Sequence, residues 1–271
     1  MQIGAKEFDT THGAYIMGIL NVTPDSFSDG GKWNRLDAAL AHGEAMVQEG
    51  AAILDVGGES TRPGHQQISE EEEINRVVPV IRALKERLDV PVSIDTCKAS
   101  VAEAALAAGA DLVNDIWGLK YDPRMAEVIA AHGAACCLMH NREKPEYRNL
   151  MPDLLADLRE SLELADRAGI PRDRILLDPG IGFGKTREQN LEVIRQVGQL
   201  RSLGCPVLLA TSRKSVIGLT LDLPVDQRVE GTIATSVIGL IQGCSFFRVH
   251  DVKENLRAIR MAQAIGFYAE A

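Results

Sequence analysis

The stretch "AAILDVGGESTRPGHQQISEEEEINRVVPVIRALKERLDVPVSID" (residues 51–95) decides the fold, because it contains one complete strand, helix and strand. Its two ends, "AAILDVG" and "VPVSID", are short runs that are apolar on both faces, as is typical of buried parallel strands. Between them the pattern predicts a helix from about Ser69 to Leu88, whose first turn offers a capping box of Ser69 and Glu72. The stretch therefore predicts two parallel strands joined by a helix.

The same unit recurs along the whole chain. The further predicted strands are "AYIMGIL" (14–20), "DLVNDI" (111–116), "AACCLMH" (134–140), "RILLD" (174–178), "PVLLAT" (206–211) and "SFFRVH" (245–250). The predicted helices cover about residues 35–49, 69–88, 100–108, 123–132, 152–168, 188–202, 225–241 and 252–264, with further capping boxes at Ser100/Glu103 and Asp251/Glu254. Eight such units predict the α/β class and a closed (β/α)8 TIM barrel, in a single domain over residues 1–271. The residues ahead of the first strand are expected to form a short plug or hairpin under the barrel.

Length and composition agree with this fold and exclude some partners. The chain has 271 residues, 45% of them apolar, and a net charge of −9 whose acidic residues are spread over the predicted helices. Nucleic acid and anionic membranes are therefore not expected as partners. Five cysteines without a CxxC pair indicate buried thiols in a reducing compartment, and no signal peptide or membrane span is recognisable, so we expect a cytoplasmic protein.

Nearly every predicted strand ends in polar groups that an apolar core would reject. In a barrel the carboxyl ends of the strands meet at one mouth, where barrel enzymes keep their chemistry. A single polar strand end can be structural, but a whole rim of titratable groups favours an active site. These residues are Asn21, Asp55, Asp95, Asn114, Asp115, His140, Asp178, Ser212 to Lys214, Arg248 and His250.

The rim residues divide into two chemical kinds. Basic groups and one hydroxyl form a cationic arc suited to phosphates, made of Thr61, Arg62, Lys214, Arg248 and His250. Carboxylates and an amide, Asp95, Asn114 and Asp178, could pair with the N–H edge of a flat heterocycle. The alternative is that the arginines and aspartates neutralise one another as ion pairs at the rim.

The segment "DPGIGFGKT" (178–186) is close to two nucleotide-binding patterns and fits neither. A P-loop needs glycine where Pro179 stands, and the dinucleotide fingerprint needs glycine where Lys185 stands. Serine-hydrolase and HExxH zinc motifs are absent from the sequence, and His140 with Cys136 or Cys137 indicates packing rather than a catalytic dyad.

Two long loops follow the first two strands. They are "NVTPDSFSDGG" (21–31) and "GGESTRPG" (57–64), and each could order around a substrate as a lid or form a solvated turn.

Seven segments in order resemble the dihydropteroate synthase family along almost the whole chain. They are "GILNVTPDSFSDGG", "DVGGESTRPG", "SIDT-K", "VNDI", "DPGIGFGKT", "TSRKSVIG" and "RVHDV". The resemblance implies a barrel that joins p-aminobenzoate to 6-hydroxymethyl-7,8-dihydropterin diphosphate and releases diphosphate. It also implies Mg²⁺ as cofactor, small-molecule substrates as partners, and a homodimer.

The resemblance also implies roles for individual residues. The pterin ring would contact Asp95, Asn114, Met139, Asp178 and Lys214. The diphosphate would contact Asn21, Thr61, Arg62, Arg248 and His250, and Asn21 would also be the Mg²⁺ ligand. The p-aminobenzoate pocket would contain Phe27, Pro63, Phe183, Ser212 and Lys214. The residues that act in catalysis would be Asp95, Lys214, Arg248 and His250.

Two other functions remain open at this point. A methyltetrahydrofolate-dependent methyltransferase would share the ring-binding aspartates and asparagine but would not need the Thr61/Arg62 loop or the Arg248/His250 pair. A non-catalytic pterin-binding relative would be expected to have lost Asp95, Lys214 or Arg248, and all three are present.

Overall fold

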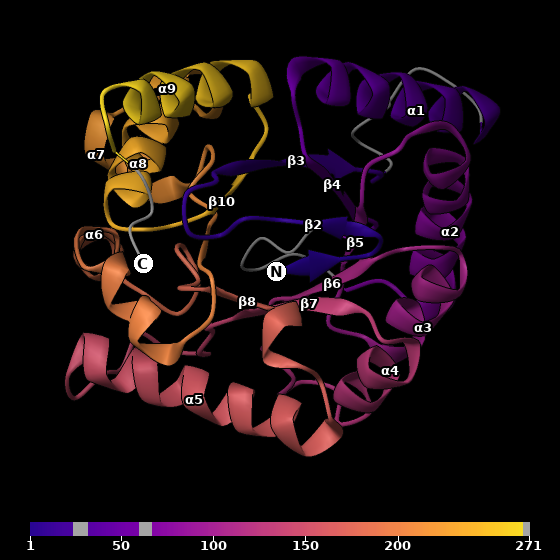
Figure 1. Ribbon diagram of the computed structural model, residues 1–271, viewed down its shortest axis with the longest axis horizontal. Coiled ribbons are helices and arrows are strands. Elements are labelled where there is room, and N and C mark those ends of the chain that lie inside the picture. Colours follow the sequence, from indigo (N-terminus) through magenta and orange to yellow (C-terminus); the bar gives the residue numbers. More distant parts are fainter. Residues whose placement is uncertain (24–31, 60–66, 268–271) are drawn as a thin grey trace.

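The protein folds into a closed barrel of eight parallel strands surrounded by helices (Figure 1). The computed structural model describes residues 1–23, 32–59 and 67–267. The strands lie in the order β8-β7-β6-β5-β4-β3-β10-β9, and a parallel bridge between Leu177 and Val207 joins the two edges. Their bounds are β3 Tyr15–Asn21, β4 Ile53–Gly57, β5 Val92–Asp95, β6 Leu112–Asp115, β7 Ala135–Met139, β8 Ile175–Asp178, β9 Leu208–Leu209 and β10 Phe246–Val249. The predicted TIM barrel is therefore confirmed.

The helices follow the strands in the predicted alternation. They are α1 Lys32–Glu49, α2 Glu70–Arg87, α3 Ala99–Ala107, α4 Met125–His132, α5 Leu150–Ala168, α6 Arg187–Arg195, α7 Ser215–Leu221, α8 Val229–Ile241 and α9 Val252–Ala264, with 3-10 turns η2 Arg172–Arg174, η3 Val197–Leu203 and η4 Val225–Gln227. None of the helices in the described ranges combines the length and apolar content that a membrane crossing requires.

Two predicted helices differ from the observed ones. The helix predicted over 188–202 ends at Arg195 and continues as η3, where Gly198 packs against the backbone of Gln242. The helix predicted over 225–241 begins as η4, and the additional helix α7 precedes it. A short helix such as α7 buries too little for its apolar periodicity to mark it in the sequence.

One of the three predicted capping boxes is confirmed as a helix cap. Ser69 accepts a hydrogen bond from the Glu72 backbone N–H at 3.1 Å. The prediction for Ser100 is wrong, because α3 begins at Ala99 and the Ser100 hydroxyl donates to Glu70 instead. The prediction for Asp251 is right about the start of α9, where it is the N-cap residue, but its side chain makes no cap bond because its carboxylate binds Arg213. A capping box that was not predicted joins Thr186 and Gln189 at the start of α6, so the threonine of "GKT" caps a helix.

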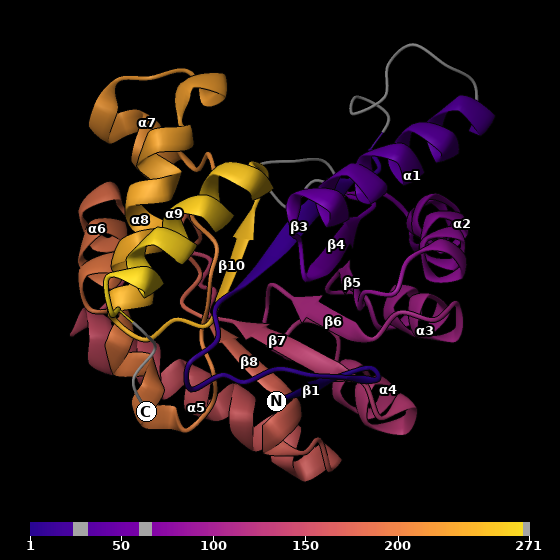
Figure 2. The ribbon, with the colours of Figure 1, turned by 45° about the horizontal axis from the view of Figure 1, so that its top comes forward.

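The barrel interior has an apolar floor that is closed from below. The inward-facing apolar residues are Met17, Ile53, Leu112, Ala135, Cys137, Leu176, Leu208 and Phe246, and they pack with Ile3 and Phe8 of the amino-terminal segment. Strands β1 (Gln2–Ile3) and β2 (Lys6–Glu7) form an antiparallel hairpin, as predicted. Figure 2 shows it at the end of the barrel where the strands begin. The opposite end is left for polar residues.

Candidate active site

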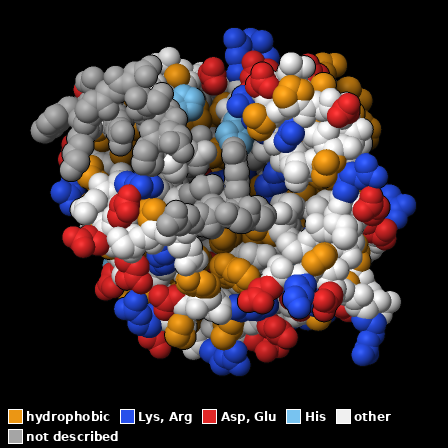
Figure 3. Space-filling view, turned by 180° about the vertical axis from the view of Figure 1, so that it is seen from behind, with side chains coloured by type: hydrophobic (Ala, Val, Ile, Leu, Met, Phe, Trp, Pro, Cys, Tyr) orange, Lys and Arg blue, Asp and Glu red, His pale blue; other side chains and the backbone are white. Residues whose placement is uncertain are grey.

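Strand alternation places the polar strand ends inside the mouth of the barrel. Side chains two residues apart on a strand share a face, so residues beyond the apolar floor on the same parity also point inward. These are Asn21, Asp55, Asp95, Asn114, Met139, Asp178, Arg248 and, just past the strand ends, Ser212 and His250. Asp178 pairs in register with Met139, which is buried and forms the wall beside it. Figure 3 shows this face, with histidine and basic side chains around its centre.

Arg248 connects two carboxylates at the mouth, those of Asp55 and Asp95. Its Nε donates to Asp55 Oδ2 at 2.5 Å and one terminal nitrogen donates to Asp95 Oδ2 at 2.6 Å. Asn114 Nδ2 also donates to Asp55 Oδ2, at 3.2 Å. The guanidinium is 14% exposed, and the two aspartates are 0% and 4% exposed. The ion-pair alternative therefore applies to Arg248, which belongs to the carboxylate side of the site as well as to the cationic arc.

Burial and mutual contacts shift the pKa values in this cluster. Burial raises the pKa of Asp95 to about 7, although the neighbouring Arg248 charge opposes this shift. Burial alone would lower the pKa of Arg248, but the carboxylates of Asp55 and Asp95 outweigh it and raise that pKa. The guanidinium is therefore permanently charged, whereas Asp95 can gain or lose a proton near neutral pH.

The same cluster contains acceptor atoms without a partner. Within residues 1–23, 32–59 and 67–267, the buried side-chain atoms that lack one are Asp55 Oδ1, Asp95 Oδ1 and Ser93 Oγ. Buried polar atoms are nearly always hydrogen-bonded, and leaving one unpaired costs stability. This cluster is therefore suited to a ligand that presents several N–H donors.

Asp178 and Lys214 form the other side of the mouth. Asp178 Oδ1 accepts a hydrogen bond from Gly180 N at 2.7 Å, and burial raises its pKa while Lys214 lowers it. Burial lowers the pKa of Lys214 to about 8, against the effect of Asp178. Lys214 Nζ donates to Ile181 O at 2.5 Å and lies 4.8 Å from the centre of the Phe183 ring. A carboxylate, an ammonium and an aromatic face thus line one wall.

A strained turn holds Ser212 and Lys214 in place. Arg213 has a φ of 55°, which is uncommon for a residue with a side chain. Both of its guanidinium contacts go to the Asp251 carboxylate, at 3.0 and 2.5 Å, and Arg228 binds its carbonyl oxygen at 3.0 Å. Ser212 Oγ lies 2.9 Å from His250 Nδ1 and accepts a hydrogen bond from His250 N at 3.1 Å. The end of β10 and the segment after β9 are therefore fixed to each other.

Four predicted site residues lie outside the described residues. They are Phe27, Thr61, Arg62 and Pro63, on the two loops that follow β3 and β4. The structure does describe Asn21 and Gly57, the last residues of β3 and β4. Asn21 Oδ1 and the Asp95 carboxylate both come within 4 Å of the point where a side chain on Gly57 would begin, so glycine keeps this part of the mouth open.

Lys98 is a residue that the functional analysis of the sequence missed. Its Nζ donates to Glu59 Oε2 at 2.5 Å, to Ile68 O at 2.9 Å and to Glu73 Oε2 at 2.7 Å. Glu59 and Ile68 stand on either side of residues 60–66. The lysine of "SIDT-K" therefore fixes both described ends of the segment that carries Thr61, Arg62 and Pro63, and only its place in that motif could have indicated it.

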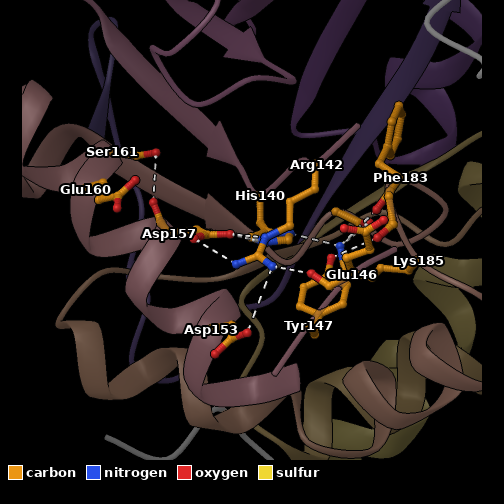
Figure 4. Close-up of polar contacts among 12 residues, drawn as sticks. His140, Arg142, Glu146, Tyr147, Asp153, Asp157, Glu160, Ser161, Phe183 and Lys185 are labelled. Atoms are coloured by element: carbon orange, nitrogen blue, oxygen red, sulfur yellow. Dashed lines mark hydrogen bonds and ion pairs between the residues drawn. The ribbon is translucent and has the colours of Figure 1, made fainter. Parts of the chain in front are cut away.

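A second group of buried charges lies behind the Asp178 side of the mouth. His140 Nε2 lies 3.0 Å from Asp157 Oδ2, and Arg142 Nε donates to the same oxygen at 2.6 Å (Figure 4). Lys185 Nζ lies 2.9 Å from His140 Nδ1. Burial, together with the charges of Lys185 and Arg142, lowers the pKa of His140 to about 4 despite its bond to Asp157. Cys136 and Cys137 are buried in the core, which agrees with the prediction that His140 forms no dyad with them.

The depressed pKa of His140 gives a prediction about acid stability. In the unfolded chain this histidine takes up a proton near pH 6.5, whereas in the folded protein it stays neutral to about pH 4. Stability is therefore fully present above pH 6.5 and is lost as the pH falls towards 4. Between pH 7 and pH 5 the wild type should lose ~2 kcal/mol more unfolding free energy than a His140→Gln variant. Urea unfolding of both proteins at the two pH values measures this, and equal losses would contradict it.

The fold and the mouth together define a class of protein, a TIM barrel whose mouth combines buried carboxylates with fixed cations. The chain belongs to the family of pterin binding enzymes, whose model matches residues 17–250. Relatives over nearly the full length are dihydropteroate synthases: that of Clostridium beijerinckii is 59% identical over 98% of this chain and 99% of its own, and that of Bacillus subtilis is 54% identical over 92% and 88%.

Solved structures agree with this assignment. The dihydropteroate synthase of Clostridium difficile in the presence of pteroic acid has a TM-score of 0.94 and 53% identity, covering 96% of this chain and 100% of that one. The Yersinia pestis enzyme in a sulfonamide drug complex has a TM-score of 0.91 and 43% identity, with 98% of both chains covered. The Xanthomonas albilineans enzyme with 4-aminobenzoic acid has a TM-score of 0.90 and 42% identity, with 93% of both chains covered.

Proposed function

We infer that the protein is a dihydropteroate synthase, a transferase of folate biosynthesis. It joins 6-hydroxymethyl-7,8-dihydropterin diphosphate to p-aminobenzoate, forming 7,8-dihydropteroate and diphosphate. The observation that carries this inference is the buried cluster of Asp55, Asp95, Asn114 and Arg248, whose unpartnered acceptor atoms match the N–H edge of a pterin. Full-length relatives with this activity support it.

We propose that the pterin ring lies between the two sides of the mouth. Asp95, Asn114 and Asp178 would face its nitrogen atoms, Met139 would contact its plane and Lys214 would bind its carbonyl oxygen. Asp55 joins this set through its shared bonds with Arg248 and Asn114. The buried carboxylate oxygens Asp55 Oδ1 and Asp95 Oδ1 have no partner, and they disfavour a ring that lacks N–H groups because both would stay unpaired.

The remaining residues would hold the diphosphate and p-aminobenzoate. For the diphosphate we propose Asn21, Thr61, Arg62, Arg248 and His250, and for p-aminobenzoate Phe27, Pro63, Phe183, Ser212 and Lys214. The contact between Ser212 and His250 supports placing the two substrates next to each other. These side chains are hydrogen-bonded to each other and lie nearer to the mouth opening than Arg248, which is two residues before His250 on the same strand face. We propose that sulfonamides compete with p-aminobenzoate for this pocket.

The chemistry needs charge stabilisation more than proton transfer. The bond between the exocyclic CH₂ and the diphosphate oxygen breaks, and its electron pair leaves with the diphosphate, where fixed cations meet the growing charge. The amine nitrogen of p-aminobenzoate then forms the new bond to the CH₂ and releases one proton. Asp95 and Asp178 face the ring and favour positive character at the CH₂, so we propose a loose transition state with early departure of diphosphate. The amine is neutral at pH 7 and needs orientation rather than deprotonation.

We propose Mg²⁺ as the cofactor, with Asn21 as its protein ligand. Mg²⁺ prefers oxygen ligands and often combines one or two from the protein with waters and substrate phosphates. The amide oxygen of Asn21 beside Gly57 fits such a site, and among the described residues no group of His, Cys, Asp and Glu offers a cage made only of protein. Bound Mg²⁺ would neutralise charge on the departing diphosphate. Calorimetric titration of pterin diphosphate with and without Mg²⁺ tests this, and identical affinities would contradict it.

An assay with both substrates and Mg²⁺ tests the proposed function against its alternatives. Formation of dihydropteroate and diphosphate identifies a synthase. Methyl transfer from methyltetrahydrofolate without that product would identify the methyltransferase, and pterin binding without either reaction would identify a non-catalytic relative.

We also propose a homodimer and a cytoplasmic location. Large apolar side chains are exposed on and next to α7, α8 and α9, and such a patch is typical of an interface. They are Leu219, Leu221, Val225, Ile238, Ile241, Met261, Ile265 and Phe267. Light scattering after size-exclusion chromatography should give twice the chain mass of 29.4 kDa. The five cysteines are free thiols, as expected in a reducing compartment.

A further inference from the structure

Lys185 uses its ammonium group on the protein itself rather than on the mouth. Its Nζ donates to Gly180 O at 2.9 Å and to Phe183 O at 3.1 Å, and it lies 2.9 Å from His140 Nδ1. Burial lowers the pKa of Lys185 to about 7, and its protonated form has three N–H donors and no acceptor, so in that form these contacts use all of the donors. His140 Nδ1 therefore accepts, and its Nε2–H donates to Asp157. The lysine of "GKT", the part of the segment that resembles a P-loop, thus binds backbone oxygens of its own loop.

The group that supports Lys185 is fixed in turn by α5 and the segment before it. Arg142 binds both oxygens of Asp157, at 2.6 and 3.1 Å, and lies 4.4 Å from the centre of the Tyr147 ring. The Tyr147 hydroxyl donates to Gly184 O at 2.8 Å. Figure 4 shows these side chains together with Lys185 and Phe183. Two independent contacts, from Lys185 and from Tyr147, therefore hold residues 180–184.

The loop needs such support because its backbone is unusual and crowded. Gly180, Gly182 and Gly184 all have positive φ, at 68°, 86° and 54°. Glycine loses more conformational freedom on ordering than any other residue, so three of them make the loop costly to hold in one conformation. The front of the same loop forms the wall of the mouth, where Ile181 O binds Lys214 and the Phe183 ring lies against its ammonium group.

We propose that Lys185 is a positioning residue that fixes the 180–183 turn, and thereby the Phe183 ring, for p-aminobenzoate. This inference rests on the proposed function. Asp178 also accepts a hydrogen bond from Gly180 N of this turn, but its backbone is held without Lys185, because Asp178 pairs in register with Met139 of β7 and His140 N donates to Asp178 O at 2.9 Å. Loss of Lys185 should therefore act mainly on p-aminobenzoate and much less on the pterin.

The experiment compares Lys185→Met with Lys85→Met under conditions that saturate the other substrate. Lys85 donates to the Asp111 carboxylate at 2.7 Å and lies at the closed end of the barrel, so its variant controls for the loss of a partly buried lysine contact away from the mouth. In Lys185→Met we expect KM for p-aminobenzoate to rise about 10-fold or more, as when a charged hydrogen-bond donor is lost. KM for pterin diphosphate should change less than about 3-fold. Lys85→Met should keep both constants.

Chemical rescue of a Lys185 variant and a variant of Asp157 provide two further tests. Lys185→Cys treated with bromoethylamine regains an ammonium at nearly the same distance and should regain the low KM for p-aminobenzoate, with treated wild type as the control for Cys97. If Lys185→Met does not fold, Asp157→Asn should show a smaller shift with the same preference for p-aminobenzoate.

The outcomes distinguish this inference from the proposed function. If the wild type is active and Lys185→Met changes both KM values equally, or only lowers the melting temperature, then Lys185 is a structural residue only. A wild type without synthase activity would instead contradict the proposed function, and Lys185 could then be assigned no substrate role.

Discussion

Replacement of Arg248 by methionine should lower kcat/KM for the condensation by at least ~10²-fold, as loss of one fixed transition-state donor commonly does. The guanidinium is the cation nearest to Asp55 and Asp95, with contacts of 2.5 and 2.6 Å. Its removal frees two buried carboxylates and, in the proposed binding mode, takes away a charge that would meet the leaving diphosphate and loosens Asp95, which would face the pterin. Bare pterin, which carries no phosphate, should therefore also bind more weakly. Steady-state kinetics and calorimetry with bare pterin measure the two effects.

The control for this prediction separates charge from geometry. Arg248→Lys keeps the charge but loses the fork that reaches both aspartates, so its kcat/KM should lie between those of the wild type and Arg248→Met. Breaking a buried ion pair also destabilises a protein, by roughly 3–5 kcal/mol. Asp55→Asn in the Arg248→Met background should restore part of the stability without restoring activity. A methionine variant within about 5-fold of the wild-type kcat/KM would contradict the assigned role.

Replacement of Asp178 by asparagine should abolish pterin binding while leaving the fold intact. The shape is kept, but the charge that faces the N–H edge of the ring is lost, and charged hydrogen bonds contribute about 1.5–3 kcal/mol each. Because Asp178 supports the charge on Lys214, whose pKa is already lowered to about 8, that lysine would also become neutral more readily. We therefore expect a fall in kcat/KM of about 10²-fold or more.

The melting temperature is the control for the Asp178 variant. Burial raises the pKa of Asp178, which means that the charged carboxylate destabilises the folded, ligand-free protein. Asp178→Asn should therefore be at least as stable as the wild type. Asp166→Asn, which changes an exposed aspartate paired with Arg172, should bind pterin normally. Near-normal pterin binding by Asp178→Asn would remove this residue from the site.

The local pattern of the sequence was enough to predict the barrel and the location of its mouth. Alternating strand and helix periods fixed the eight units, and polar residues at strand ends, such as Asp95 and Asp178, indicated the active end. Helix α7 was not predicted because its seven residues bury only Val216, Ile217 and Gly218. Caps at Ser100 and Asp251 failed because distant partners compete for the side chains, Glu70 in one case and Arg213 in the other.

Contacts across the barrel were beyond the reach of sequence patterns. Arg248 was assigned to the cationic arc, with ion pairing to rim aspartates as the alternative, and the sequence did not show that its partners are Asp55 and Asp95, which stand 193 and 153 residues earlier in the chain. No periodicity relates residues at such separations. The role of Lys185 was missed for the same reason, since its support comes from His140, 45 residues away. The predicted roles of Asn21, Phe183, Ser212 and His250 stay predictions, although the structure brings these residues to the mouth.

The apolar floor of the barrel has a kinetic consequence for a two-substrate enzyme. Met17, Ile53, Leu112 and Phe246 fill the interior below the polar layer, and the hairpin closes it from beneath, so a ligand can enter and leave only through the mouth. In the proposed binding mode, a pterin at Asp95 and Asn114 would lie deeper than an aromatic ring held by Ser212 and Phe183. We therefore expect the pterin substrate to bind before p-aminobenzoate, and dihydropteroate to leave through the same mouth. The order of substrate binding would thus follow from the shape of the barrel interior rather than from any single side chain.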